Sequence, residues 1–103
     1  MYICQWHLDI KFGKLGEALE IMRKWGAEKF KSSEFKRAKG AKMMVGYLGE
    51  SPSHVCDEYY FESVADFEAA IASVGQPQFK QYSDAIAPLI VDGSQIWKVY
   101  REV

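Results

Sequence analysis

The sequence predicts an α+β fold of the ferredoxin-like type, in which two split β-α-β units form a four-stranded antiparallel sheet. Four segments alternate in side-chain character with a period of two, which is typical of strands, and two segments carry apolar residues at spacings of three and four, which is typical of helices. Their order is strand, helix, strand, strand, helix, strand, and this order places both helices on one face of the sheet. The length of 103 residues and the apolar content of 49% fit a single domain, residues 1–103, with one core.

The stretch from Val55 to Ser73 is the centre of this prediction. It begins as an aromatic strand, expected over residues 54–62, and changes at Ser63 into a helix that we expect to end near Val74. The Ser63 hydroxyl can accept a hydrogen bond from the first helical turn, and Asp66 stands three residues later, in the acidic position of a capping box. Strand and helix are therefore expected to follow each other directly.

The first strand, expected over residues 2–11, has two unlike faces. One face is apolar, with Tyr2, Cys4, Trp6, Leu8 and Ile10, and the other carries Ile3, Gln5, His7 and Asp9. This alternation predicts a core on one side of the sheet and a cavity or a partly wet interface on the other.

The remaining elements are bounded by turn residues and changes of period. They are expected at residues 14–33 (helix), 34–40 (polar connection), 41–48 (strand), 49–53 (hairpin turn), 79–89 (short amphipathic segment) and 94–103 (strand). The first helix is expected to bury a stripe of Leu15, Ala18, Leu19, Met22, Trp25 and Phe30.

Charge and composition exclude several classes of partner. The 13 basic and 14 acidic residues nearly cancel, whereas nucleic-acid binding usually shows as a concentrated basic patch. No apolar run approaches the roughly 18 residues of a membrane span, and the start lacks the pattern of a secretory signal, so we expect a cytoplasmic protein. Cys4 and Cys56 fit no zinc or disulfide framework, and we expect them to be buried and too far apart to pair.

Aromatic residues occur on every predicted strand, so the helix-free face of the sheet needs a cover. Wet apolar surface is unfavourable by about 25 cal/mol per Å². A second copy of the chain is the natural cover, and we expect a homodimer.

Two parts of the chain resemble known families. The opening YICQWHLDIKFGKLGEALEIMRKW resembles the first strand and helix of NIPSNAP-like proteins, and DEYYFESVADFEAAIAS, followed by PQF and AP, is similar to the EthD-type family. Both belong to the dimeric α/β barrel superfamily, so the resemblance implies a homodimeric barrel. It also implies a pocket carboxylate at Glu58, for which a hydrogen bond between subunits or to a helix is the equal alternative.

The departures from these families bear on chemistry. The first helix has no His, Gln78 stands where related monooxygenases carry a His before Phe79, and both histidines fall on predicted strands. A haem role is therefore disfavoured, and no cofactor is expected.

The best candidate for catalysis is a pair of residues on the two central strands. If Trp6 lies opposite Glu58, then His7 meets Asp57, and Gln5 meets Tyr59. His7 would then be a general base oriented by Asp57, with Gln5 and Tyr59 as contacts to a substrate oxygen. A slip of one residue would remove Asp57 from this face.

Structural roles compete with each of these assignments. A His and an Asp on neighbouring strands are more often a structural pair than a catalytic one, His54 is expected to face solvent, and Trp6, Trp25 and Trp97 are expected to serve packing more than ligand stacking. A metal site of His7, Asp9 and His54 is disfavoured because the ligand spacing is wrong.

Two functions follow. The first is a cofactor-independent enzyme of monooxygenase, isomerase or cyclase type that acts on a hydrophobic or aromatic small molecule in a pocket between sheet and helices, where Trp6 would contact the ligand. The second is a non-catalytic binding or accessory protein.

Overall fold

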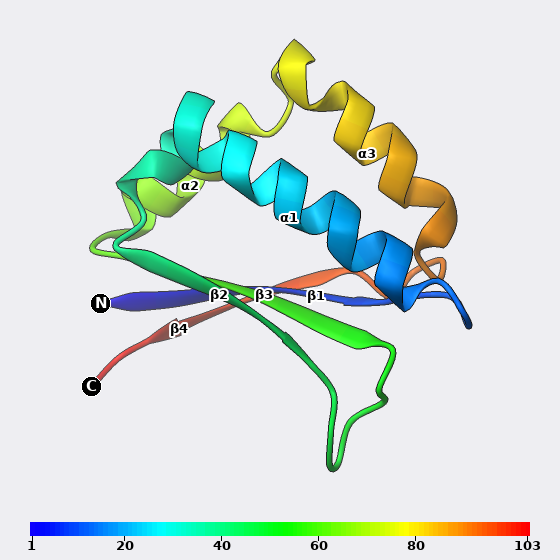
Figure 1. Cartoon of the computed structure of the whole chain (residues 1–103). Helices are drawn as coiled ribbons and strands as arrows, with labels where there is room; N and C mark the ends of the chain where they lie inside the picture. Colours follow the sequence, from blue (N-terminus) through cyan, green and yellow to red (C-terminus); the bar gives the residue numbers. More distant parts are fainter.

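The computed structural model describes residues 1–103 and contains the predicted order of elements (Figure 1). The strands are β1 (Tyr2–Asp9), β2 (Gly40–Val45), β3 (His54–Phe61) and β4 (Ile96–Arg101), and the helices are α1 (Leu15–Ser32), α2 (Val64–Ser73) and α3 (Lys80–Ile86). Short 3₁₀ turns lie at Glu34–Arg37, Pro77–Phe79 and Ala87–Leu89.

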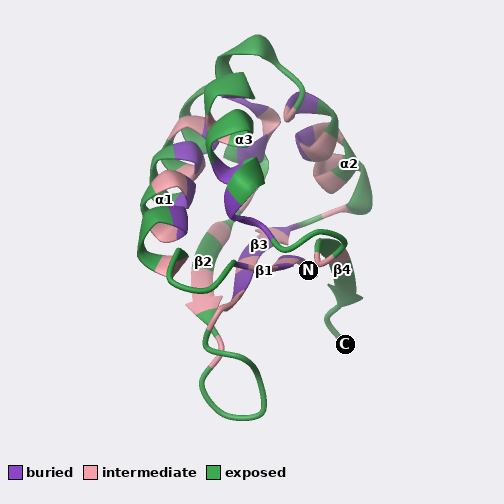
Figure 2. Cartoon of the chain, turned by 90° about the vertical axis from the view of Figure 1, so that its right-hand side faces the viewer, coloured by how far each residue is buried: buried purple, intermediate pink, exposed green.

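The four strands form one antiparallel sheet in the order β2-β3-β1-β4, so β1 and β3 are central, as predicted. All three helices lie on one side of this sheet, and its other side carries no helix (Figures 1 and 2). The ferredoxin-like fold class is therefore confirmed. The apolar face of β1 is the face that meets the helices, because Cys4, Trp6 and Leu8 are buried there.

The register between the central strands differs by one residue from the prediction. Trp6 lies opposite Asp57, and His7 lies opposite Cys56, so the predicted pairing of His7 with Asp57 is wrong. The observed register puts Tyr59 and Phe61 into the helix-side core, at 2% and 0% exposure. A slip of one residue would replace them with polar neighbours, and the burial of these rings decides the register.

The second strand is shorter than predicted because it cannot continue past Val45. A Cβ built on Gly46 would lie 1.9 Å from the Ser51 carbonyl oxygen, so only glycine fits where the backbone of Glu50 and Ser51 packs against this position. The loop then turns at Gly49, whose φ of +77° favours glycine.

Two expectations for the first helix and its exit need correction. Phe30, expected inside, is 36% exposed, whereas Lys29 is only 3% exposed and faces the sheet. The connection expected to be polar holds the fully buried Phe35, and the Ser33 hydroxyl accepts from the Phe35 N–H at 3.1 Å. The polar residues on both sides of Phe35 led to the prediction of a polar segment, although Phe35 itself belongs to the core.

The core consists of two clusters on the helix side of the sheet. The larger lies beneath α1 and α3 around Trp6, Leu8 and Trp25, and the smaller lies beneath α2 around Tyr59 and Phe61. No helix in the structure has the length and apolar character required to cross a membrane.

Candidate functional site

A cavity of about 200 Å³ lies on the helix side of the sheet, where the pieces of the core meet. It is lined by residues of β1, α1, α2, β4 and the segment before β4, namely Trp6, Trp25, Lys29, Ile71, Val74, Gln95 and Trp97. Trp6, Trp25 and Lys29 are buried, and Gln95 is exposed. The cavity therefore combines an apolar interior with a single charged group.

Lys29 places its ammonium group among aromatic rings. Its Nζ lies 4.2 Å from the ring centre of Trp25, 5.0 Å from Phe35, 5.5 Å from Trp6 and 5.7 Å from Tyr59. The negative faces of such rings attract a cation. The attraction of the rings offsets only part of the hydration free energy that the ammonium loses on burial.

No carboxylate pairs with this ammonium. The lysines that form ion pairs are Lys24, Lys39, Lys42 and Lys80. Burial lowers the pKa of Lys29 to about 8, and the charge of Asp57 opposes part of this shift. Lys29 is thus a buried amine that can exchange its proton near neutral pH.

Asp57 acts on Lys29 through its charge and lies outside the cavity. It lies on the same face of the sheet as Trp6, and its carboxylate accepts a hydrogen bond from the Tyr59 hydroxyl at 2.6 Å. Burial raises the pKa of Asp57, while Lys29 and Tyr59 lower it. Asp57 and Tyr59 line a second hollow between α1 and β2, so they do not belong to the cavity that Lys29 lines.

Trp25, which lines the cavity, carries an unpaired hydrogen-bond donor. The indole N–H of Trp25 is buried and has no partner, and it is the one buried side-chain polar atom of the protein without one. Buried donors are normally satisfied. The indole N–H is itself enclosed, so the Lys29 ammonium is the charged donor that lines the cavity.

The other predicted site residues lie on the opposite, helix-free face. Gln5 and Glu58 stand directly opposite each other, and the Gln5 amide donates to the Glu58 carboxylate at 2.8 Å. Tyr60 donates to the same carboxylate at 2.5 Å, and Lys42 lies 3.7 Å from it. Burial would raise the pKa of Glu58, but these donors outweigh it and the pKa is lowered, so Glu58 is a held anion.

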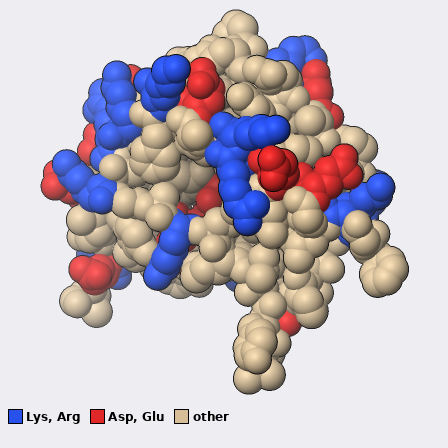
Figure 3. All heavy atoms as spheres, in the orientation of Figure 1, with Lys and Arg blue, Asp and Glu red and all other residues tan.

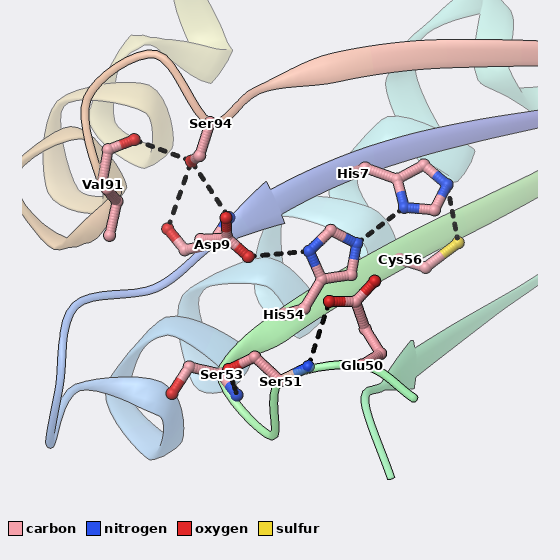
Figure 4. A network of polar contacts seen from close by, with 9 residues as sticks. All are labelled: His7, Asp9, Glu50, Ser51, Ser53, His54, Cys56, Val91 and Ser94. Carbon is pink, nitrogen blue, oxygen red and sulfur yellow. Dashed lines mark hydrogen bonds and ion pairs between the residues drawn. The ribbon is translucent and has the colours of Figure 1, made fainter. Parts of the chain in front are cut away.

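His7 joins a row of polar groups on that face (Figure 4). Its Nδ1 lies 2.7 Å from His54 Nε2, and His54 Nδ1 lies 2.8 Å from the Asp9 carboxylate. The His7 Nε2 lies 2.8 Å from the Gln5 amide oxygen. Burial lowers the pKa of His7, and the charges of Lys98 and His54 add to this effect.

This row corrects two expectations and bears on a third. The His54 side chain is 15% exposed and bonded at both nitrogens, so it does not simply face solvent. The group that orients a histidine is Asp9, in place of Asp57. The trio considered for a metal is brought together by hydrogen bonds, and no group of three or more His, Cys, Asp or Glu side chains in the structure is arranged to hold a metal ion.

The two cysteines lie on different faces of the sheet and are free. Cys4 faces the core, and Cys56 Sγ lies 3.8 Å from His7 Nε2 on the helix-free face. Burial raises the pKa of both thiols to about 11. Neither is a ready nucleophile.

Comparisons with known proteins identify the fold. The sequence matches no protein-family model and no curated protein. A solved NIPSNAP family protein from Agrobacterium tumefaciens str. C58 is 18% identical and superposes with a TM-score of 0.76 over 99% of this chain and 92% of that chain. The chain has the fold of the NIPSNAP proteins.

Further solved structures agree with this result. An uncharacterized NIPSNAP domain protein from Burkholderia xenovorans is 16% identical, with a TM-score of 0.74 over 100% of this chain and 95% of that chain. An antibiotic biosynthesis monooxygenase is 14% identical, with a TM-score of 0.71 over 100% and 99% of the two chains. The resemblance to NIPSNAP-like proteins is thus confirmed at the level of the fold, which alone does not determine function.

Lys29 was the residue that sequence reasoning missed. It continues the buried spacing Ala18, Met22, Trp25, and its position four residues after Trp25 puts it on the core face of α1. A lysine in the apolar stripe was the available signal. Lys29 was not expected in the buried stripe, because lysine side chains usually face solvent.

Proposed function

We propose that this protein binds a small aromatic molecule with an acidic oxygen, a phenol or an enol, in the cavity around Lys29, and acts on it without a cofactor. One observation carries the proposal: a buried ammonium group without a carboxylate partner lines a cavity walled by three tryptophans. The wall suits an aromatic ring, and the ammonium suits an oxygen anion.

The size of the cavity narrows the ligand. Cavities for drug-sized ligands span roughly 300–1,000 Å³, and this one measures about 200 Å³. One or two fused rings are the appropriate size. Trp6 and Trp97, whose rings are stacked with centroids 6.3 Å apart, offer a broad apolar wall.

Lys29 supplies the chemistry. As a neutral amine it takes the proton of the ligand hydroxyl, and as the resulting ammonium it holds the oxygen anion. Removal of this proton activates a phenol or enol toward isomerisation, ring closure or reaction with an oxidant. A structural neighbour is an antibiotic biosynthesis monooxygenase, which supports the monooxygenase type among these three.

A non-catalytic binding protein is the second candidate. Lys29 is the one ionisable residue among those that line the cavity, so no second group is placed there to move another proton. Binding without turnover fits that arrangement.

4-Nitrophenol tests the proposal, because its visible absorption reports whether it is bound as the anion. All three tryptophans of the chain line the cavity, so quenching of intrinsic fluorescence measures occupancy of this site. We expect saturable quenching with an increased phenolate band. Lys29→Met should weaken binding by about tenfold to a hundredfold, as for loss of a charge-assisted hydrogen bond.

Lys24→Met is the matched control, since Lys24 is on the same helix and its side chain is 68% exposed. Equal affinity in all three proteins, or no saturable quenching, would refute the proposal. Conversion of a bound phenol by the parent chain and not by Lys29→Met selects the enzyme, and saturable binding of phenols without conversion selects the binding protein.

We also propose that a second copy of the chain covers the helix-free face, and that the homodimer works in the cytoplasm. Exposed apolar side chains support this cover: Ile96 and Tyr100 lie on that face of β4, each 53% exposed. The loop between β2 and β3 leaves the sheet on the same side, away from the helices (Figures 1 and 3). It exposes Tyr47 and Leu48, at 89% and 87%.

Sedimentation of the purified chain tests the dimer. Ile96→Glu should shift it from dimer to monomer, because it buries a charge in the interface. Val64→Glu, which changes a comparably exposed residue on α2 (40% exposed), should leave the dimer intact. A parent chain that sediments as a monomer would disprove the proposal.

A further inference from the structure

We propose that the Lys29 amine is a nucleophile that condenses with small aromatic aldehydes and ketones to form an imine inside the cavity. The inference rests on the cavity of the proposed function and specifies a second ligand class for it, carbonyl compounds. Lys29 is 3% exposed, and its Nζ lies within 5.7 Å of four aromatic ring centres and forms no ion pair, so a carbonyl carbon can approach it against an apolar wall.

The neutral form of the amine is available. A lysine whose pKa is about 8 has near pH 7 roughly 200 times more neutral amine than an ordinary exposed lysine. Desolvation by the rings also removes the water that would otherwise compete for the nitrogen lone pair.

The reaction is balanced without a further reactant. The nitrogen lone pair attacks the carbonyl carbon and forms a carbinolamine, whose hydroxyl leaves as water after taking a proton, and the nitrogen loses its own hydrogens to give the C=N bond. Amine and carbonyl compound thus become imine and water.

The arrangement of the site also explains why other lysines should not react in the same way. Lys24, for example, is 68% exposed and pairs with Glu20 at 3.7 Å. An exposed amine is kept protonated by water and has no aromatic wall to collect the aldehyde. Selectivity for Lys29 is therefore the property to measure.

Benzaldehyde with cyanoborohydride tests the inference, because the reductant converts each imine into a stable benzylamine. Peptide mass spectrometry then locates every adduct. We expect Lys29 to be labelled at least about tenfold faster than Lys24, with a rate that saturates in benzaldehyde. Labelling spread over exposed amines, with no preference for Lys29, would overturn the inference.

Two variants complete the design. Lys29→Met should lose the fast adduct, and Lys24→Met should keep it, with circular dichroism to show that both are folded. If Lys29→Met does not fold, competition by benzyl alcohol replaces it. Benzyl alcohol fits the same cavity but has no carbonyl group, so it should slow the labelling of Lys29 in the parent chain. An unchanged labelling rate would contradict the inference.

The 4-nitrophenol titration separates this inference from the proposed function. Saturable phenol binding without a Lys29 adduct overturns the imine and leaves the proposed function standing. A selective Lys29 adduct without phenol binding supports the nucleophile and refutes the binding of phenols. Failure of both measurements removes both.

Discussion

His7 and His54 face each other across the central strands, with Nδ1 of one ring 2.7 Å from Nε2 of the other. His7 Nε2 also lies 2.8 Å from the Gln5 amide oxygen, and His54 Nδ1 lies 2.8 Å from the Asp9 carboxylate. Each ring is therefore held by hydrogen bonds at both of its nitrogens.

The first prediction concerns acid. The pKa of His7 is lowered in the folded chain by burial and by the charges of Lys98 and His54, and Glu50 opposes this weakly. Below the ordinary histidine pKa of about 6.5, the unfolded chain therefore binds more protons at His7 than the folded chain, and the free energy of unfolding falls as the pH falls. His7→Gln should reduce this loss, as measured by urea unfolding near neutral pH and about one and a half units below it.

The same variant separates the two faces of the sheet. His7→Gln should leave 4-nitrophenol affinity unchanged, because the cavity lies on the other face. A parallel loss of phenol binding would return His7 to the site and contradict the assignment of the cavity. If the free energy of unfolding depends on acid equally in the parent and the variant, folding does not lower the pKa of His7.

The second prediction concerns the start of α2. The Ser63 hydroxyl accepts from the Asp66 backbone N–H at 3.1 Å, and this bond holds the helix that carries Ile71 and Val74 to the cavity. Ser63→Ala should lower the free energy of unfolding by about 1 kcal/mol. Ser63→Thr retains the acceptor and should cost much less, and equal losses in both variants would show that the hydroxyl does not cap the helix.

The sequence predicted the order of elements because period and turn residues are local properties. Ser63 shows this well: its cap was visible from its spacing to Asp66 alone. The register was not visible, because Asp57 and Glu58 are adjacent acidic residues and a shift of one exchanges them between the faces. The connecting loop of residues 46–53 leaves the pairing open, and only the burial of the neighbouring rings decides it.

The candidate site depended on this register and on a tertiary environment. Gln5 and His7 lie on one face, as expected for alternate positions, but Glu58, Asp9 and His54 are their neighbours there in place of Asp57 and Tyr59. The position of Lys29 in the apolar stripe of α1 was its one local sign, because its burial depends on rings from three further segments, β1, Glu34–Arg37 and β3. Such an enclosure is not a property of local sequence.

The third prediction concerns Asp57 as a positioning residue for Lys29. Its negative charge raises the pKa of Lys29 against the effect of burial, which sets the value at about 8. Asp57→Asn keeps the shape and should lower the pKa of Lys29 further, so that reductive labelling by benzaldehyde reaches half its maximum rate at a lower pH. Tyr59→Phe is the control, because it removes the hydrogen bond from Tyr59 to Asp57 and keeps the Asp57 charge. It should shift the pH profile of labelling less than Asp57→Asn does. An unmoved profile in Asp57→Asn would show that the carboxylate does not act on Lys29.

The last prediction uses the buried amine as a measure of stability. The pKa of Lys29 falls from an ordinary value of 10.5 to about 8 on folding, so between these values the unfolded chain binds more protons and the free energy of unfolding rises with pH. The difference between these two pKa values, 2.5, corresponds to about 3 kcal/mol of unfolding free energy. The folded chain lacks this stability below pH 8 and recovers it as the pH approaches 10.5. Lys29→Met should be more stable than the parent chain near pH 7 and should lack this rise, whereas Lys24→Met should retain it. Guanidinium unfolding of the three proteins across this range measures the effect, and a parent chain whose stability follows that of Lys29→Met at every pH would show that the ammonium is solvated rather than buried among the rings.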